Sequence, residues 1–197
     1  ELLLKRIKSS GAFLGIEGVE DPEEDVLLPG KELEESDKPG DKIKVFIYKD
    51  HSSRLIATKT IPYVTLGTIA HLEVKEITKI GAFVNWGLEK DLFLPFKEQT
   101  VKLDRGRKYL MALYIDRSER LCATMKIRDY LRQDSPYKEN DWITGTIYNI
   151  VEDIGAFIAV DDQYEALLPK EECKGVLSIG ESVSARVSSV KEDGRLN

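Results

Sequence analysis

The sequence predicts an all-β protein of three tandem barrels, each built from five short strands. One motif, Gly-Ala-Phe plus an apolar residue and then Leu-Pro, occurs three times, beginning at Gly11, Gly81 and Gly155. The copies lie about 70 residues apart, too far for a solenoid repeat of ~20–50 residues but suited to an array of small domains. Short β-rich segments broken by glycine, without a long amphipathic helix, are typical of barrels.

The repeat predicts the domain boundaries. We expect barrels at residues 1–62, 63–133 and 134–197, the last of them truncated at its C-terminal end. Domains this small bury only ~60% of their unfolded surface, so neighbouring barrels should stabilise one another. Short linkers that contain proline, at 61–63 and 134–137, should hold adjacent barrels in a semi-rigid relation.

The middle unit shows the strand pattern most clearly. Its five strands are expected at Gly67–Thr78, Ala82–Trp86, Asp91–Leu94, Lys108–Ile115 and Arg120–Met125. Gly81 interrupts the pattern after the first strand, as a glycine does at a bulge or a sharp bend. The longest connection precedes the fourth strand, and the turn 116–119 joins the fourth strand to the fifth.

The third unit repeats this order as far as the chain continues. Its strands are expected at Thr144–Val151, Ala156–Val160, Glu165–Leu168 and Val183–Val190, with the fifth beginning at Arg195. The segments Lys31–Asp37 and Lys170–Lys174 should form a helical turn or two. The acidic run Glu20–Asp25 in the first unit should be an exposed, flexible insertion between two strands.

With 42% hydrophobic and 32% charged residues, the composition is that of a soluble globular protein. No apolar run approaches the ~20 residues that cross a bilayer, and no secretory signal is visible. Cys122 takes the strand position of Ile56 in the first unit, which predicts a small buried hydrophobe. Neither Cys122 nor Cys173 has a metal-ligand pattern, so a reducing, cytoplasmic location is expected. His51 and His71 match no repeated position and should lie at the surface.

The net charge of −6 is unevenly divided along the chain. The first unit carries 10 basic and 13 acidic side chains, the second 13 and 9, and the third 6 and 13. Their net charges are therefore −3, +4 and −7. Only the middle unit offers an average field that attracts a polyanion.

The ordered set of motifs resembles the S1 RNA-binding domain, a five-stranded variant of the OB-fold. The resemblance rests on the Gly-Ala-Phe strand, the Leu-Pro after the third strand, a fourth strand of the Pro39–Tyr48 type and a final hairpin that leads into Arg-Leu. The set of motifs occurs three times, and the three copies together span essentially the whole chain. The resemblance implies tandem OB-fold barrels of the S1 type that bind RNA.

A narrower resemblance is to the conserved virulence factor B family. It rests on the order Leu-Leu-Pro, Val-Phe-Ile-Tyr, Arg-Leu-Ile-Ala-Thr-Lys and Gly-Ala-Phe-Val-Asn-Trp-Gly-Leu, and on residues 190–197 of the third unit. This resemblance implies a bacterial protein in which tandem RNA-binding barrels precede a C-terminal winged-helix domain. The sequence shows no such domain, begins without methionine and ends within the fifth strand, so we expect it to be a fragment.

The repeated phenylalanines Phe13, Phe83 and Phe157 are the first candidate RNA-binding residues. Strand alternation sends Ala82 and Val84 to one face and Phe83 to the other. If the smaller pair faces the barrel interior, the ring lies outside, where a stacked base would contribute ~1–3 kcal/mol. Phenylalanine is more often a core residue, and repetition alone fits both interpretations. The resemblance to S1 domains favours RNA contact.

The last hairpin supplies a second candidate set. Asp50 and Arg54 in the first unit have the same spacing as Asp116 and Arg120 in the second. A cross-strand ion pair, worth ~0–1 kcal/mol at a surface, would explain this spacing. The resemblance implies instead that the arginine meets phosphate or stacks on a base. The third unit retains Arg195, but a lysine stands where the aspartate belongs.

Lys79 and Trp86 complete the candidate surface of the middle barrel, with Lys75 and Arg117 nearby. Scattered lysines are more often simply solvated, and this is the simpler interpretation of Lys75. Two positions depart from the S1 pattern in every copy: serine or isoleucine replaces the usual aromatic before the motif glycine, and proline replaces the usual histidine after strand three. These departures favour a weaker or more specialised interaction.

We expect a cytoplasmic RNA-binding protein of regulatory purpose that contacts single-stranded RNA, chiefly through its middle barrel. The alternative is a protein-interaction scaffold in a ribosome- or transcription-associated complex, whose acidic outer units bind a basic partner. The sequence has no histidine beside a repeated serine or cysteine, no phosphate-binding glycine loop and no acidic cluster with metal spacing. We therefore expect no enzyme activity, no cofactor, no metal and no membrane association.

Overall fold

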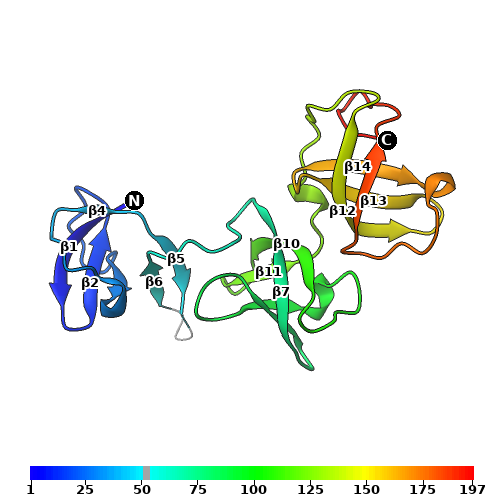
Figure 1. Ribbon diagram of the computed structural model, residues 1–197. Coiled ribbons are helices and arrows are strands. Elements are labelled where there is room, and N and C mark those ends of the chain that lie inside the picture. Colours follow the sequence, from blue (N-terminus) through cyan, green and yellow to red (C-terminus); the bar gives the residue numbers. More distant parts are fainter. Residues whose placement is uncertain (51–53) are drawn as a thin grey trace. The chain divides into compact units, whose positions relative to one another are not determined.

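The computed structural model describes residues 1–50 and 54–197, and its regular structure consists of strands and three-residue 3-10 helices (Figure 1). The strands form three sheets, of six, five and four strands. Each sheet follows one copy of the repeat, which confirms the all-β class and the three tandem barrels of the OB-fold type. His51, expected at the surface, lies outside the described residues.

The first barrel closes through a parallel strand pair. Its strands are β1 (Leu2–Lys8), β2 (Gly11–Gly15), β3 (Val26–Pro29), β4 (Lys42–Ile43), β5 (Phe46–Lys49) and β6 (Leu55–Thr58), in the sheet order β4-β1-β2-β3-β6-β5. The short strands β4 and β5 are two halves of the expected fourth strand, because β4 pairs with β1 and β5 pairs with β6. Parallel pairing of Leu27 in β3 with Ile56 in β6 completes the barrel.

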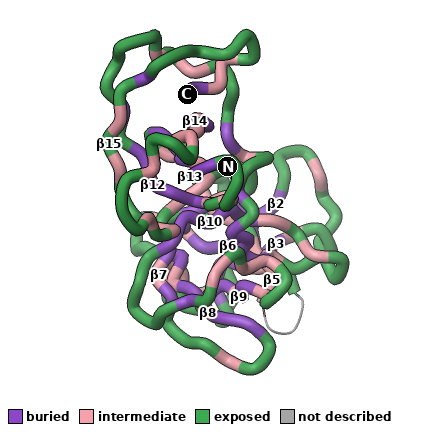
Figure 2. The backbone as a smooth tube through the Cα atoms, turned by 90° about the vertical axis from the view of Figure 1, so that its right-hand side faces the viewer, coloured by how far each residue is buried: buried purple, intermediate pink, exposed green. Residues whose placement is uncertain are grey.

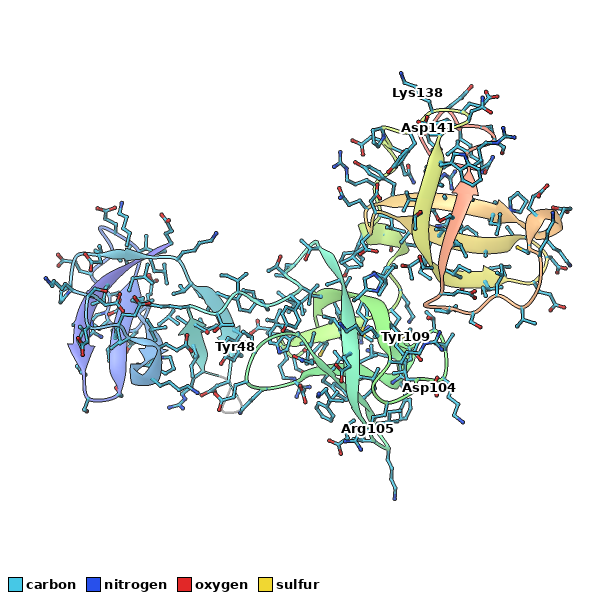
Figure 3. The ribbon with its side chains drawn as sticks, viewed as in Figure 1. Tyr48, Asp104, Arg105, Tyr109, Lys138 and Asp141 are labelled. Carbon is cyan, nitrogen blue, oxygen red and sulfur yellow. The ribbon has the colours of Figure 1, made fainter. Side chains whose placement is uncertain are left out.

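The second barrel has the five strands that the sequence predicts. They are β7 (Ile69–Ile77), β8 (Gly81–Asn85), β9 (Leu92–Pro95), β10 (Lys108–Ile115) and β11 (Leu121–Thr124), in the order β11-β10-β7-β8-β9. The fourth strand matches its expected bounds, and β9 packs beside β11. Tyr109 on β10, labelled in Figure 3, is 2% exposed, and its hydroxyl accepts the N–H of Asp104 at 3.2 Å. Residues Tyr109–Leu113 of β10 are all buried, so this strand contributes to the core of the barrel.

The third barrel has four strands and a bridged fifth position. Its strands are β12 (Trp142–Val151), β13 (Gly155–Val160), β14 (Tyr164–Pro169) and β15 (Ser182–Arg186), in the order β14-β13-β12-β15. Leu196 forms a parallel bridge with Ala166 and an antiparallel bridge with Val190. Leu196 is fully buried, so it contributes to the core at the position where the other barrels have their last strand.

A close approach between strands explains the three motif glycines. Gly11, Gly81 and Gly155 have φ angles of 138°, 153° and 132°. A Cβ atom at these positions would lie 2.1, 2.5 and 2.1 Å from the carbonyl oxygen of the leucine in the following Leu-Pro pair. Any side chain would push the third strand away from the second, so the glycine and the Leu-Pro pair recur together.

The bulge expected at Gly81 lies instead within the first strand of each barrel. The register between the first two strands shifts at Lys5 in β1, at Lys75 in β7 and at Tyr148 in β12. A bulge leaves one extra residue unpaired and redirects the side chains around it. The shift also decides which residue stands opposite each motif phenylalanine.

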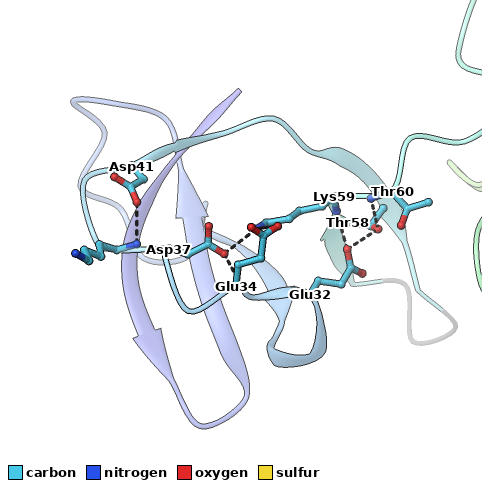
Figure 4. Close-up of polar contacts among 8 residues, drawn as sticks. Glu32, Glu34, Asp37, Asp41, Thr58, Lys59 and Thr60 are labelled. Carbon is cyan, nitrogen blue, oxygen red and sulfur yellow. Dashed lines mark hydrogen bonds and ion pairs between the residues drawn. The ribbon is translucent and has the colours of Figure 1, made fainter.

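In the first two barrels a threonine–glutamate hydrogen bond, here called the clasp, joins the end of the last strand to the 3-10 helix after the third strand. Thr58 donates its hydroxyl hydrogen bond to Glu32 at 2.7 Å (Figure 4), and Thr124 donates to Glu98 at 2.8 Å. Both threonines are 4% exposed, so the clasp satisfies a buried hydroxyl in each complete barrel.

The helical elements are single turns. They are Gly30–Glu32, Phe96–Glu98, Arg128–Tyr130 and Lys170–Glu172. The first and last fall within or beside the short helical segments that the sequence predicts. Within the described part of the chain, no helix has the length and apolar character that a membrane span requires.

The chain divides into two compact units by its internal contacts. One is Glu1–Pro62 with Gly87–Glu89, and the other is Tyr63–Trp86 with Lys90–Asn197. Figure 2 shows buried residues along the strands and exposed residues along the connecting loops. The second and third barrels share one hydrophobic cluster, formed by Leu110, Ala112, Ile127, Leu131, Tyr148 and Ala159. Because of this cluster they form one unit, while the predicted division at residue 133 remains a prediction.

The substitution Gly81→Ala should destabilise the second barrel by ~2–5 kcal/mol, because it adds left-handed backbone strain to a clash with a strand carbonyl. Gly106→Ala is the matched control: Gly106 also has a positive φ, of 82°, but no atom lies within 4 Å of its added Cβ. The control should lose only ~1–2 kcal/mol. Calorimetric unfolding of both variants measures the difference, and equal losses would show that the close approach does not require glycine.

Candidate nucleic-acid interface

The Gly-Ala-Phe strands present their phenylalanines on the outer face of each barrel. Ala82 and Val84, on either side of Phe83, are fully buried, and their counterparts in the other barrels are buried as well. Phe13, Phe83 and Phe157 are half-buried. The predicted alternation is therefore confirmed, and the rings are not core residues of their own barrels.

Two cations lie over the ring of Phe13. The bulge at Lys5 places Arg6 directly opposite Phe13 in the β1–β2 pair. The guanidinium carbon of Arg6 is 4.6 Å from the ring centroid, and the ammonium of Lys8 is 5.3 Å from it. The first barrel thus combines an aromatic face with positive charge, as sites for single-stranded nucleic acid do.

A buried carboxylate holds Arg6 in place. The side chain of Asp25 is 1% exposed and forms ion pairs with Arg6 and with Lys5, the latter at 2.9 Å. Burial by itself would raise the pKa of Asp25, but hydrogen bonds from Lys5 and Arg6 hold that pKa below its usual value. The expectation that the whole run Glu20–Asp25 is exposed is therefore wrong at its last residue, because a carboxylate between two cations is stable when buried.

Phe83 contacts a second ring rather than a cation. Phe93 stands opposite it on β9, with ring centroids 5.3 Å apart and planes at 44°. On the other side, Glu76 of β7 is the residue opposite Phe83. The middle barrel therefore has a larger aromatic surface than the first barrel, with an acidic residue at its border.

Aspartate–arginine pairs brace the last hairpin of the first two barrels. Asp116 accepts the backbone N–H of Arg120 at 2.9 Å and its guanidinium at 3.3 Å. Asp50 accepts the same groups of Arg54 at 3.0 and 2.9 Å. The side chains of Arg120 and Arg54 remain 63% and 70% exposed. Each arginine is thus oriented by the turn and still presents donors to solvent.

The strand that follows the braced hairpin of the middle barrel, β11, packs beside β9, which carries Phe93. Cys122 on β11 is 3% exposed, which confirms the predicted small buried hydrophobe, and its sulfur lies 3.8 Å from Asp116. Burial is the main cause that raises the pKa of Cys122 to about 11, so the thiol is protonated at neutral pH.

The third barrel braces its arginine by a different route. Lys191 occupies the aspartate position, since its N–H donates to the carbonyl of Arg195 at 2.9 Å as the N–H of Asp116 does to Arg120. Asp193, two residues further on, accepts Nε of Arg195 at 2.7 Å. This hydrogen bond is the main cause that lowers the pKa of Asp193. The arginine is retained although the aspartate has moved.

One expectation for the middle barrel needs correction. Trp86 is 4% exposed and its indole N–H donates to the carbonyl of Lys90 at 2.5 Å, so its ring offers no free face for a base. Lys75 is the unpaired residue of the bulge and forms an ion pair with Glu73 at 3.3 Å. Lys79, in the turn between β7 and β8, is exposed as the sequence predicts.

Phe157 lies at the junction of the second and third barrels. Its ring packs against the hydrophobic cluster that the two barrels share, 6.2 Å from the ring of Tyr148. The guanidinium carbon of Arg128 lies 5.6 Å from its centroid. Sequence reasoning missed Arg128 because it lies after the last strand of the second barrel, outside the repeated motifs. It also missed Phe93, which strand alternation places on the same face as Phe83.

The chain belongs to the S1 domain family, whose model matches residues 1–60 and 66–126. A crystal structure of a multidomain protein with nucleic acid binding domains from Streptococcus pneumoniae TIGR4 matches with a TM-score of 0.60 at 20% identity, over 100% of this chain and 70% of that one. This likeness supports the fold.

Curated relatives confirm the narrower resemblance. The chain is 30% identical to the uncharacterized protein YitL of Bacillus subtilis over 186 residues, 90% of this chain and 62% of that protein. It is 26% identical to conserved virulence factor B of Staphylococcus saprophyticus over 185 residues, 88% of this chain and 62% of that protein. The chain thus spans 62% of the length of these two relatives.

The stability contributed by the hairpin brace should depend on pH. The pKa of Asp116 is lowered, mainly by the backbone N–H of Arg120, so the ionised carboxylate stabilises the folded state above the unfolded pKa of about 3.9. That contribution is lost as pH falls through the lower, folded-state pKa. The free-energy difference between the wild type and Asp116→Asn should therefore be largest near pH 6 and shrink below about pH 4.

Urea unfolding between pH 3 and pH 7 measures this difference. Asp91→Asn is the control, because Asp91 is exposed and has no hydrogen bond or ion pair to any described residue. A wild-type advantage over Asp116→Asn that stays constant across this range would contradict the role of the charge.

Proposed function

We propose that the chain binds single-stranded RNA through the outer faces of its first two barrels. The observation that carries the proposal is the set of outward phenylalanines, Phe13 beneath Arg6 and Lys8 and Phe83 beside Phe93, on barrels of the S1 family. Stacking on an aromatic ring suits every base, and a nearby cation meets the backbone. The chemistry of the faces and membership of the family both support the proposal.

In the proposed mechanism, bases stack on Phe13 and Phe83 while the braced arginines meet phosphate. Arg54 and Arg120 suit this role because an aspartate fixes one edge of each guanidinium and leaves the other edge exposed. Lys79 adds an exposed ammonium at the tip of the β7–β8 hairpin. Preorganisation of this kind reduces the side-chain entropy lost on binding.

A regulatory purpose in the cytoplasm forms part of the proposal. It is supported by the relatives named conserved virulence factor B. The second candidate function, a scaffold that binds a basic protein, is supported by the net charge of −7 in residues 134–197 and by Trp142, which is 72% exposed. We favour RNA because both phenylalanine faces lie on the two less acidic units.

Fluorescence anisotropy with a labelled single-stranded RNA of about 12 nucleotides tests the proposal, since this length covers one or more OB-fold sites. Phe83→Leu should weaken binding about five- to hundredfold, because one stacked base contributes ~1–3 kcal/mol. Affinity should also fall steeply with salt, with a log–log slope of about −0.7 per phosphate contacted.

Phe96→Leu is the matched control for this measurement. Phe96 is 52% exposed on the same barrel but follows β9 rather than standing beside Phe83. It should leave affinity unchanged. Equal losses in both variants would indicate nonspecific apolar adhesion. Absence of salt-sensitive binding by the wild type would contradict RNA binding and favour the scaffold.

A further inference from the structure

We propose that the junction between the second and third barrels binds one base of the same RNA strand. The inference rests on the proposed function and adds a site that neither barrel forms alone. A cavity of about 170 Å³ lies at this junction, and Thr100, Lys126, Arg128, Asn149 and Phe157 are among its lining residues. Its volume is below the ~300–1,000 Å³ of pockets for drug-sized ligands, which suits a single planar group.

The wall of the cavity offers a stacking surface. Phe157 is half-buried and contacts Tyr148 on one side, and the guanidinium of Arg128 faces its ring at 5.6 Å. Aromatic rings and guanidinium planes are the two side-chain surfaces on which unstacked RNA bases lie. At this junction Arg128, from the C-terminal segment of the second barrel, and Phe157, from β13, supply the two surfaces.

A buried carboxylate orients Arg128 for this role. The side chain of Glu165 is 5% exposed. It forms an ion pair with Nε of Arg128 at 3.1 Å and accepts a hydrogen bond from the hydroxyl of Tyr148 at 2.9 Å. The side chain of Arg128 is nevertheless 59% exposed. Its terminal N–H groups have no hydrogen bond to any described residue, so they remain available to a phosphate or a base edge.

The side-chain amide of Asn149 can form hydrogen bonds with the edge of a base. The bulge at Tyr148 places Asn149 directly opposite Phe157 in the β12–β13 pair. Its side-chain amide makes no hydrogen bond within the described chain, and an amide both donates and accepts. The equivalent residues opposite Phe13 and Phe83 are Arg6 and Glu76, so the neutral amide is particular to the third barrel.

The second barrel also supplies the positive charge that the acidic third unit lacks at the junction. Residues 134–197 carry a net charge of −7, which by itself would repel a phosphate backbone. The cations at the junction come from the second barrel's C-terminal segment instead. Lys126, which lines the cavity, is 57% exposed at its side chain and 3.7 Å from Glu98, and Arg128 follows it two residues later. The third barrel supplies the aromatic ring and the amide, and its neighbour supplies the positive charge.

Photo-crosslinking of the full 197-residue chain to a single-stranded RNA that contains 5-iodouridine tests the inference, together with anisotropy on the same RNA. We expect a crosslink in the peptide that contains Asn149 and Phe157. Asn149→Ala and Phe157→Leu should each weaken binding by about fivefold or more, as the loss of one base contact of ~1 kcal/mol predicts.

The matched control is Thr144→Ala with Lys138→Ala. Thr144 lies exposed on the same strand, and Lys138 is an exposed lysine before β12, labelled in Figure 3. Wild-type binding with no junction crosslink, and junction variants equal to this control, would overturn the inference while the proposed function stands. Absence of wild-type binding would overturn both. A loss in the Phe157 variant without a loss in the Asn149 variant and without a crosslink would identify a structural role only, and would also overturn it.

Discussion

The contact on which each barrel depends is the close approach of the motif glycine to the carbonyl that precedes the Leu-Pro proline. At Gly11, Gly81 and Gly155 the third strand lies so near that a Cβ would be 2.1 to 2.5 Å from the carbonyl oxygen. This approach fixes the register of strands two and three, and register fixes which side chains face outward. The glycine is thus a structural requirement, and the outward position of the following phenylalanine is its consequence.

The barrels share the same strand arrangement, but the residue at the bulge of the first strand differs between them and makes different contacts. Lys5 and Tyr148 both bond to an acid at the start of strand three, Asp25 and Glu165 respectively. In the first barrel this arrangement holds a cation over the outward ring, whereas in the third barrel it joins the C-terminal segment of the second barrel to the third through Arg128. One local irregularity therefore supports an open face in one barrel and an interdomain junction in another.

The sequence alone predicts the fold well because a repeated pattern supplies three independent views of one barrel. The strand bounds of β7 to β11 and the burial of Cys122 follow from alternation and alignment of the copies. The burial of Trp86 and Asp25 does not, since it depends on tertiary contacts at a strand end and between cations. The role of Arg128 at the junction could not be predicted either, because the residue follows the last strand and belongs to none of the repeated motifs.

The most direct test of the central claim is an NMR titration of the chain, selectively labelled on its six phenylalanines, with single-stranded RNA. Phe96, which is 52% exposed but lies outside the strands, serves as the internal reference. Ring resonances of Phe13 and Phe83 should shift upfield, as protons beneath a stacked base do, while those of Phe96 stay in place. Uniform small shifts, or shifts at Phe96 alone, would contradict the claim that the outward motif rings form the nucleic-acid surface.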